Sequence, residues 1–393
     1  MGTTMMKRRT FLKNACLGYA GSLARRLKAD EAKLFTQPET PPIHTHGLPG
    51  YEPSPLGMPG LYPGKVVEVF DPRAISNNRV SEPAVRRMLD AGMRELTGKS
   101  SLLDAWSLFV KPNDVVGIKI NPSGAPACYS SPELVREIIR CLELIGVPRH
   151  NIVIYDRYSY EVEMGSFQAF LPVGIRLVGI ENGWPDLSGY DMNVYCEANF
   201  FGEWETRSYL ACVVSREVTK IINVPTLKDH SASGVTGCLK NLGYGSFNNV
   251  ARSHHQPITF TDPLIGIMCS VEPLRSKAVL HIMDGMREVW HGGPLTQVQK
   301  FIAQSGLLIL GTDPVAVDTI ELETIEKKRK LEGALSLWDR NPENITPDSN
   351  EYYYNPNKNL FYRQPGHISA AGKLGLGVSD LHKIDRRRIE LGT

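Results

Sequence analysis

Cysteine is sparse and widely spaced in this chain of 393 residues, which argues against one class of metal site. The seven cysteines include no Cys-x-x-Cys pair, and none stands within four residues of another. Iron–sulfur clusters and zinc knuckles that cysteines hold need closely spaced thiolates. We therefore expect no cysteine-ligated cluster, and we expect most of the cysteines to be small buried apolar residues.

Long apolar runs and an excess of one charge are missing as well. No apolar run approaches eighteen residues, so we expect no transmembrane helix. Nucleic-acid binding proteins carry a strong basic excess, whereas this chain has 44 basic against 42 acidic residues and a formal net charge of +2. The composition is that of an ordinary globular protein, with a length that suits one large domain or two.

The N-terminus carries a motif that resembles a bacterial twin-arginine export signal. Arg8 and Arg9 lie in the run Lys-Arg-Arg-Thr-Phe-Leu-Lys of residues 7–13, and a short apolar region, 15–24, follows. We expect residues 1–30 to be a signal segment that the twin-arginine export machinery recognises, which places the protein in the periplasm. The resemblance implies export in the folded state, often with a cofactor inserted beforehand. The alternative is a basic, disordered N-terminus.

The rest of the chain divides into three predicted parts. Residues 31–64 are rich in proline and glycine and predict an extended arm. Residues 65–330 predict an α/β core domain with an insertion of short antiparallel strands near 175–214. Residues 331–393 predict a polar excursion and a C-terminal segment.

Short apolar runs alternate with longer helical patterns through the predicted core domain. This alternation predicts an α/β fold, with a mostly parallel sheet, helices on both of its faces and a small antiparallel insertion. The predicted strands are 65–70, 114–121, 151–157, 218–227, 278–286 and 306–313, and the predicted helices are 81–96, 131–146 and 314–330.

Polar residues gather where several of the predicted strands end. Ligands of an open parallel sheet bind beyond the carboxyl ends of its strands, where loops and helix N-termini converge. Because proteins avoid burying unpaired charge, charges at several such ends indicate a site. Taken singly, each charge could instead cap a helix or lie solvated in a loop. The residues at these ends are Lys119, Asn121, Asp156, Arg157, Lys228, His230, Asp284 and Asp313.

The segment 221–249 adds a turn that suits an anion. The turn from Ser231 to Gly237 supplies backbone N–H groups before a short predicted helix, and Lys228 and Lys240 add positive charge. The phosphate-loop and dinucleotide glycine patterns are both absent. We expect a small polar or anionic ligand here, bound by Asn121, Lys228, Ser231, Gly234, Asn241 and Asp313.

Four residues are predicted to be catalytic: His230, Lys240, Lys119 and Asp284. Imidazole titrates near working pH, so His230 is the predicted general acid or base, and the lysines stabilise developing negative charge. Lys119 interrupts an apolar strand and needs a carboxylate partner, an anionic ligand or a lowered pKa. Asp284 and Asp313 are the candidate partners.

Four segments resemble, in the same order, the domain-of-unknown-function family three-six-two. They are GIKIN (117–121), PTLKDHSASGVTGCLKNLGYG (225–245), HIMDG (281–285) and GTDPVAVD (311–318), and the resemblance runs from about residue 65 to 377. Members are often labelled iron–sulfur-centre proteins because some carry an extra ferredoxin module. The cysteine ligands of such a module are missing here, so the label does not carry over.

A more remote similarity, to the nickel-pincer lactate racemase family, rests on the ten-residue spacing of His230 and Lys240. In that family the corresponding lysine holds the pincer cofactor and a downstream histidine ligates nickel. The resemblance implies a transition metal bound by His230, His254 and His255. The chain departs from the family pattern at 237–239, where Gly-Cys-Leu precedes the lysine. A surface pair of loop histidines is the alternative.

These observations favour an exported α/β enzyme that acts on a small polar or anionic substrate, with the cofactor, if any, unknown. One alternative is a periplasmic binding protein, without catalysis, for an anionic ligand or a metal. A second alternative is a metal- or pincer-cofactor enzyme. A third is an interaction protein, for which the tyrosines of residues 351–354 are the hint.

Overall fold

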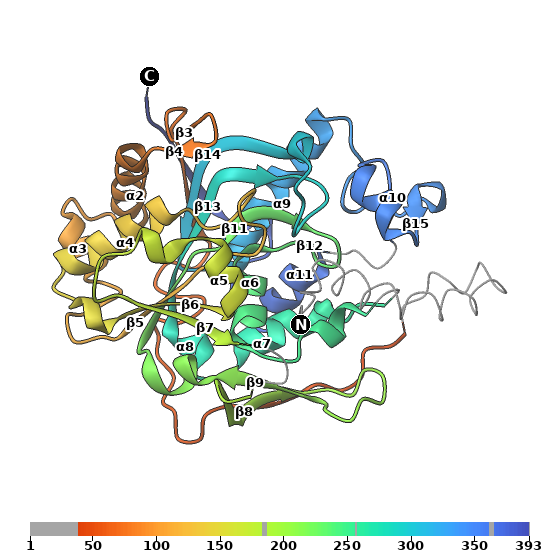
Figure 1. Cartoon of the computed structure of the whole chain (residues 1–393), viewed down its shortest axis with the longest axis horizontal. Helices are drawn as coiled ribbons and strands as arrows, with labels where there is room; N and C mark the ends of the chain where they lie inside the picture. The colour runs from red at the N-terminus through yellow and green to blue at the C-terminus, as the bar shows by residue number, and fades with distance from the viewer. Residues whose placement is uncertain (1–37, 183–186, 256–257, 361–364, 393) are drawn as a thin grey trace, which may run out of the picture.

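A computed structural model describes residues 38–182, 187–255, 258–360 and 365–392 (Figure 1). The predicted signal segment, residues 1–30, lies outside them. Within these residues no helix has the length and apolar character that a membrane crossing needs.

A ten-stranded sheet forms the centre of the molecule, and its strands follow the order β17-β2-β14-β13-β10-β5-β6-β7, with β11 and β12 attached beside β13. The run from β13 to β7 is parallel, whereas β14 is antiparallel to both neighbours. The predicted mostly parallel sheet is therefore confirmed. The strands are β2 (Lys65–Phe70), β5 (Val116–Lys119), β6 (Ile152–Tyr158), β7 (Arg176–Glu181), β10 (Lys220–Asn223), β11 (Thr226–His230), β12 (Gly234–Val235), β13 (Ala278–Val289), β14 (Ile302–Gly311) and β17 (Asp385–Glu390).

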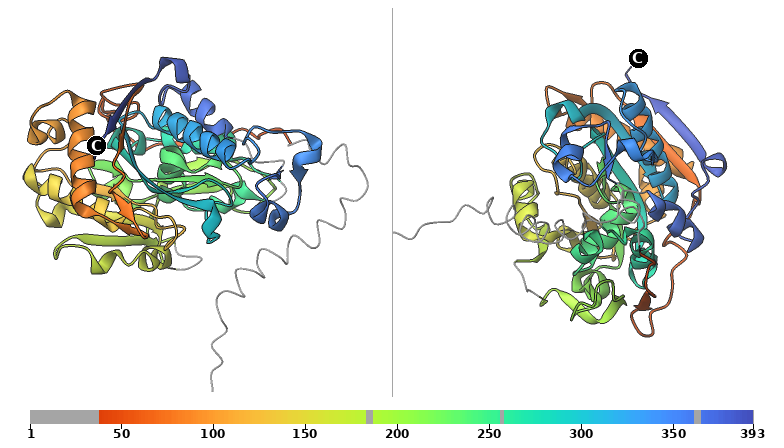
Figure 2. Two further views of the ribbon diagram at one scale, coloured as in Figure 1. Left: turned by 90° about the horizontal axis from the view of Figure 1, so that it is seen from above. Right: turned by 90° about the vertical axis from the view of Figure 1, so that its right-hand side faces the viewer.

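Helices cover both faces of this sheet, as the alternating pattern predicts (Figures 1 and 2). Successive side chains of a strand point to opposite faces, so Val66 and Tyr155 belong to one apolar core while Val67 and Ile154 belong to the other. The helices of the first core are α6 (Gly237–Ser246), α7 (Thr261–Ser270), α9 (Pro314–Leu331) and α11 (Gly366–Lys373), and those of the second are α2 (Glu82–Thr97), α3 (Leu102–Trp106) and α4 (Pro132–Leu144).

A small antiparallel sheet lies apart from the main one, as expected for the insertion. It contains β8 (Tyr190–Glu197) and β9 (Arg207–Ala211), and β1 (His44–His46) pairs with β8 from the proline-rich arm. The first strand of the 175–214 segment, β7, instead extends the main sheet in parallel. The remaining elements with α or β labels are α5 (Ser159–Met164), α8 (Leu274–Lys277), α10 (Ser349–Tyr354), β3 (Ile75–Ser76), β4 (Arg79–Val80), β15 (Ile345–Thr346) and β16 (Asn359–Leu360).

Candidate functional site

A cavity of about 300 Å³ opens at the carboxyl ends of β5, β6 and β11, beneath α6 and the short helix η4 (Ala251–His254). This is the edge of a parallel sheet at which ligands bind. Most of the residues that line it carry polar or charged groups. The lining residues are Lys119, Asn121, Ser123, Asp156, Arg157, Tyr158, Glu161, Lys228, Thr236, Lys240, Asn241, Tyr244, Gly245, Val250, Ala251, His254 and Pro294.

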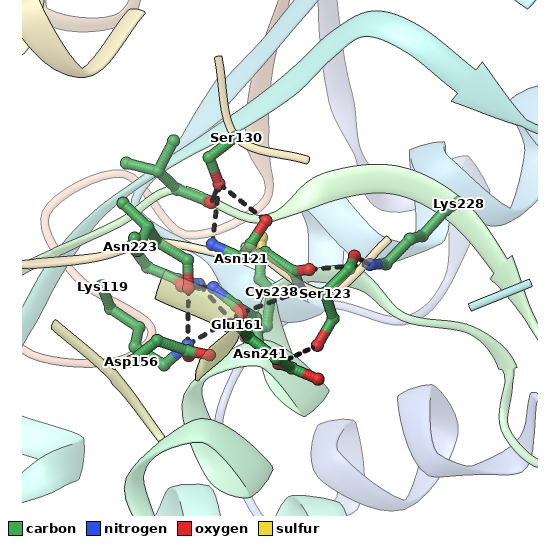
Figure 3. Close-up of polar contacts among 12 residues, drawn as sticks. Lys119, Asn121, Ser123, Ser130, Asp156, Glu161, Asn223, Lys228, Cys238 and Asn241 are labelled. Atoms are coloured by element: carbon green, nitrogen blue, oxygen red, sulfur yellow. Dashed lines mark hydrogen bonds and ion pairs between the residues drawn. The ribbon is translucent and has the colours of Figure 1, made fainter. Parts of the chain in front are cut away.

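Lys119 is fully buried in this wall and is paired with a carboxylate (Figure 3). Its ammonium donates to the carbonyl oxygen of Ile120 at 2.6 Å and to Oδ1 of Asn241 at 3.0 Å, and it forms an ion pair with Asp156. Burial lowers the pKa of Lys119, and the charge of Asp156 acts in the opposite direction. The predicted partners, Asp284 and Asp313, are thus corrected to Asp156, which lies near the carboxyl end of the neighbouring strand β6.

Two asparagines, Asn241 and Asn121, join Lys119 to a second buried lysine, and Asn223 holds Asn241 from the side. Asn121 donates to Asn241 at 3.0 Å, and Asn241 donates to Asn223 at 2.7 Å. Lys228 donates to Oδ1 of Asn121 at 2.7 Å and to the carbonyl oxygen of Ser123 at 2.5 Å, while burial lowers its pKa. The structure therefore brings Lys119, Asn121, Lys228 and Asn241 together, as the sequence predicts.

Lys240 lies in the same wall but stands outside this network. Its ammonium lies 4.7 Å from the centroid of the Tyr244 ring. It makes no hydrogen bond or ion pair with any residue that the structure describes. Burial, followed by the positive charge of Lys228, lowers the pKa of Lys240 to about 7. Near neutral pH this side chain therefore exchanges readily between ammonium and free amine.

The opposite charge in the cavity comes from Asp156 and Glu161. The hydroxyl of Ser123 donates to Glu161, and burial, followed by the charge of Asp156, raises the pKa of the Glu161 carboxyl. Four basic side chains and two acidic ones line the cavity, so positive charge is in excess. The fourth basic side chain, Arg157, pairs on its far side with Glu181 at 2.8 Å.

Two neighbouring histidines, His230 and His254, lie at or beside the cavity. His230 is buried beside the cavity, and its Nδ1 accepts backbone N–H groups of Ala232 at 3.0 Å and Ser233 at 3.4 Å. The ring of His254 lines the cavity, 5.5 Å from the His230 ring, and burial and the charge of Lys240 lower its pKa to about 3. His255 is exposed and lies against Phe201.

The other residues predicted to bind a ligand or act in catalysis lie outside the cavity, and the two carboxylates among them accept hydrogen bonds from backbone N–H groups. Asp284 accepts N–H groups of Ser131 at 2.6 Å and Met286 at 2.9 Å. Asp313 caps α9 through the N–H of Ala316 at 2.8 Å. Neither carboxylate lines the cavity. The same holds for Ser231 and Gly234, which form the turn between β11 and β12.

A carboxylate of the protein is bound just after the predicted anion-binding turn, at the start of α6. Asp318 accepts the N–H groups of Cys238 at 2.5 Å and Leu239 at 3.0 Å at the start of α6. A side chain at Gly237, where φ is +61°, would collide with that carboxylate. Within the predicted turn, the N–H groups of Ser231 and Thr236 donate to backbone carbonyls, and those of Ala232 and Ser233 donate to His230.

Several residues in or near the cavity were not predicted from the sequence. Glu161 and Thr236 follow no strand-end pattern, and Tyr244 reads as an ordinary helix residue. His367 of α11 is fully buried near Lys240, whose charge, after burial, helps to lower the pKa of this imidazole to about 3. Glu161 and His367 carry no sequence signal, whereas Thr236 and Tyr244 lie in the segment 225–245 that resembles the family.

The donors do not fit a metal centre. Among the described residues no three His, Cys, Asp or Glu side chains gather as a metal ion would require. The described cysteines are all free, and most of them are buried. We therefore derive no chemical step through a metal or a cluster.

Comparison with known proteins places the chain in a family without assigning an activity. No curated protein matches it significantly. A crystal structure of a Thermotoga maritima protein is similar with a TM-score of 0.37 and 10% identity, over 66% of this chain and 60% of that one. The family model described as "Domain of unknown function (DUF362)" matches residues 109–323. That match spans more than half of the 393 residues, so the chain belongs to this family.

Proposed function

We propose that the cavity is the active site of an enzyme that acts on a small anionic substrate, with Lys240 as its reactive base. One observation carries the proposal: the Lys240 ammonium lines the cavity without a hydrogen bond to any described residue, and its pKa is about 7. Perturbed pKa values cluster at sites where groups must gain and lose protons. A base works best when its pKa lies near the operating pH.

The surrounding charges support an anionic substrate. Lys228 and Arg157 add positive charge to the wall, and a cavity lined mainly by one sign of charge concentrates ligands of the opposite sign. Glu161, whose pKa burial raises, can hold a proton across from the amine. This assignment moves the acid–base role from His230 to Lys240, because Nδ1 of His230 is engaged by the backbone.

The proposal is tested by incubating the full chain with a mixture of small organic acids and phosphate esters, followed by mass spectrometry. We expect one compound to be consumed and a product to form. The rate falls below a pH of about 7, because the protonated amine is no base. Lys240→Met abolishes the reaction, whereas Lys99→Met, at an exposed lysine, leaves it unchanged.

Two results contradict the proposal. A compound retained in stoichiometric amount and recovered unchanged identifies a binding protein, which the excess of positive charge would also suit. The absence of both binding and turnover removes the site altogether. Circular dichroism of Lys240→Met confirms that the variant is folded before its activity is compared.

A further inference from the structure

Lys240 is held rigidly at the edge of the cavity. It is the fourth residue of α6, whose first N–H groups are fixed by Asp318 of α9. Its ammonium contacts the Tyr244 ring and has no hydrogen-bond partner among the described residues. The side chain is only partly exposed, toward the cavity. An ammonium that has lost much of its water and has no protein partner is costly there, whereas a neutral amine is tolerated. The location therefore favours the form of lysine that carries a free electron pair.

Neighbouring positive charges strengthen this preference. Lys228 and Lys119 both lie in the same cavity, and both donate to oxygen atoms that act as acceptors. These hydrogen bonds stabilise the charged forms of the two lysines, and their positive charges lower the pKa of Lys240. A lysine that is desolvated and placed beside other cations is activated as a nucleophile toward carbonyl carbon.

The wall also contains the groups that such a reaction needs. Glu161 receives a hydrogen bond from Ser123, and burial raises the pKa of its carboxyl, so this group can pass a proton from the nitrogen to the leaving oxygen. Thr236 directly precedes α6 and lines the same cavity as Lys240. The Thr236 hydroxyl is buried and has no described partner, which leaves it available to a substrate oxygen.

We propose that Lys240 forms an imine with an aldehyde or ketone that carries a carboxylate or phosphate group, with this group lying against Lys228 and Arg157. The inference rests on the proposed function and names the substrate class of the same site. Both anions accept charge-assisted hydrogen bonds from these two cations.

The step balances without an oxidant or a reductant. The Nζ atom of Lys240 attacks the carbonyl carbon, and a C–N bond forms. The nitrogen loses two protons during the reaction. The carbonyl oxygen takes up two protons and departs as water, so the protons balance. Glu161 delivers a proton to the leaving oxygen, and a C=N bond remains.

The test uses the full chain, sodium cyanoborohydride and three probes: pyruvate, glyceraldehyde 3-phosphate and acetone. Reduction traps an imine, so peptide mapping shows Lys240 heavier by the mass of the probe less one oxygen atom. We expect one or both anionic probes to label Lys240 at least about tenfold faster than acetone, since a charge-assisted hydrogen bond contributes that factor. Which probe is faster distinguishes a carboxylate from a phosphate substrate.

Three variants and a competing anion test which residues the labelling depends on. Lys240→Met loses the label, Lys228→Met slows labelling of the intact Lys240 by about tenfold, and Lys99→Met has no effect. We also expect inorganic phosphate to slow the labelling of the wild-type protein. This competition test does not depend on whether any variant folds. Labelling spread over surface lysines, or equal rates for acetone and the anionic probes, overturns the inference.

The inference and the proposed function fail in different ways. If the organic-acid mixture is turned over but no probe is trapped on Lys240, the imine is wrong and the acid–base role stands. If nothing is turned over and phosphate does not bind, both are wrong.

Discussion

The buried pair of Lys119 and Asp156 makes a quantitative prediction about stability. Their side chains are 1% and 7% exposed. In Lys119→Met the carboxylate of Asp156 stays buried without its cation, and the acceptors on Ile120 and Asn241 lose a donor. Removal of one partner from a buried ion pair costs about 3–5 kcal/mol.

The reverse change costs less. In Asp156→Asn, Lys119 keeps its two other acceptors, and burial already lowers its pKa, so the amine can release its proton. We expect a loss of about 1–3 kcal/mol, the cost of one unsatisfied buried polar group. The double variant buries neither charge, so its loss falls short of the sum of the single losses by about 2 kcal/mol.

Urea unfolding followed by tryptophan fluorescence measures these free energies, since Trp106 is fully buried. The matched control is the exposed pair of Arg388 and Glu390, whose cycle is expected to show no measurable coupling. Additivity of the Lys119 and Asp156 losses within about 0.5 kcal/mol would refute the reasoning.

Two further changes test the site and the export signal. A side chain at Gly245 would collide with Lys119, so we expect Gly245→Ala to lower the free energy of unfolding by about 1–3 kcal/mol and to weaken phosphate binding. The control is Gly243→Ala, which is tolerated because the nearest contacts of its side chain lie at 3.4 Å. Equal effects of the two changes would contradict this account. We also propose export through residues 1–30: replacing Arg8 and Arg9 by lysine retains the protein in the cytoplasm on cell fractionation, and an unchanged location argues against the signal.

The elements of the core were largely predictable because their patterns are local. Residues 65–70 form a strand and 314–331 a helix within one residue of the expected bounds. Long-range pairings were not predictable. The pairing of β14 with β2, and the addition of β1 and β17 at sheet edges, involve partners more than a hundred residues away in the sequence.

The candidate site was predictable in part for the same reason. Lys119, Asn121, Lys228 and Asn241 follow strand-end and turn patterns, and they meet in one network. Glu161 and His367 carry no such pattern. The backbone roles of Asp284 and Asp318 depend on N–H groups that other segments bring to them.

The sequence by itself determined the fold class and several of the residues at strand ends, since apolar periodicity and turn residues act over a few positions. Asp284 was wrongly placed at a strand end, because β13 continues to Val289. The tertiary structure alone decided which of those ends are neighbours. Lys119 meets Asp156 because β6 lies directly beside β5, whereas Asp284 lies on β13, beyond β10. Strand order follows from the packing of whole faces against helices, a property that no local pattern specifies.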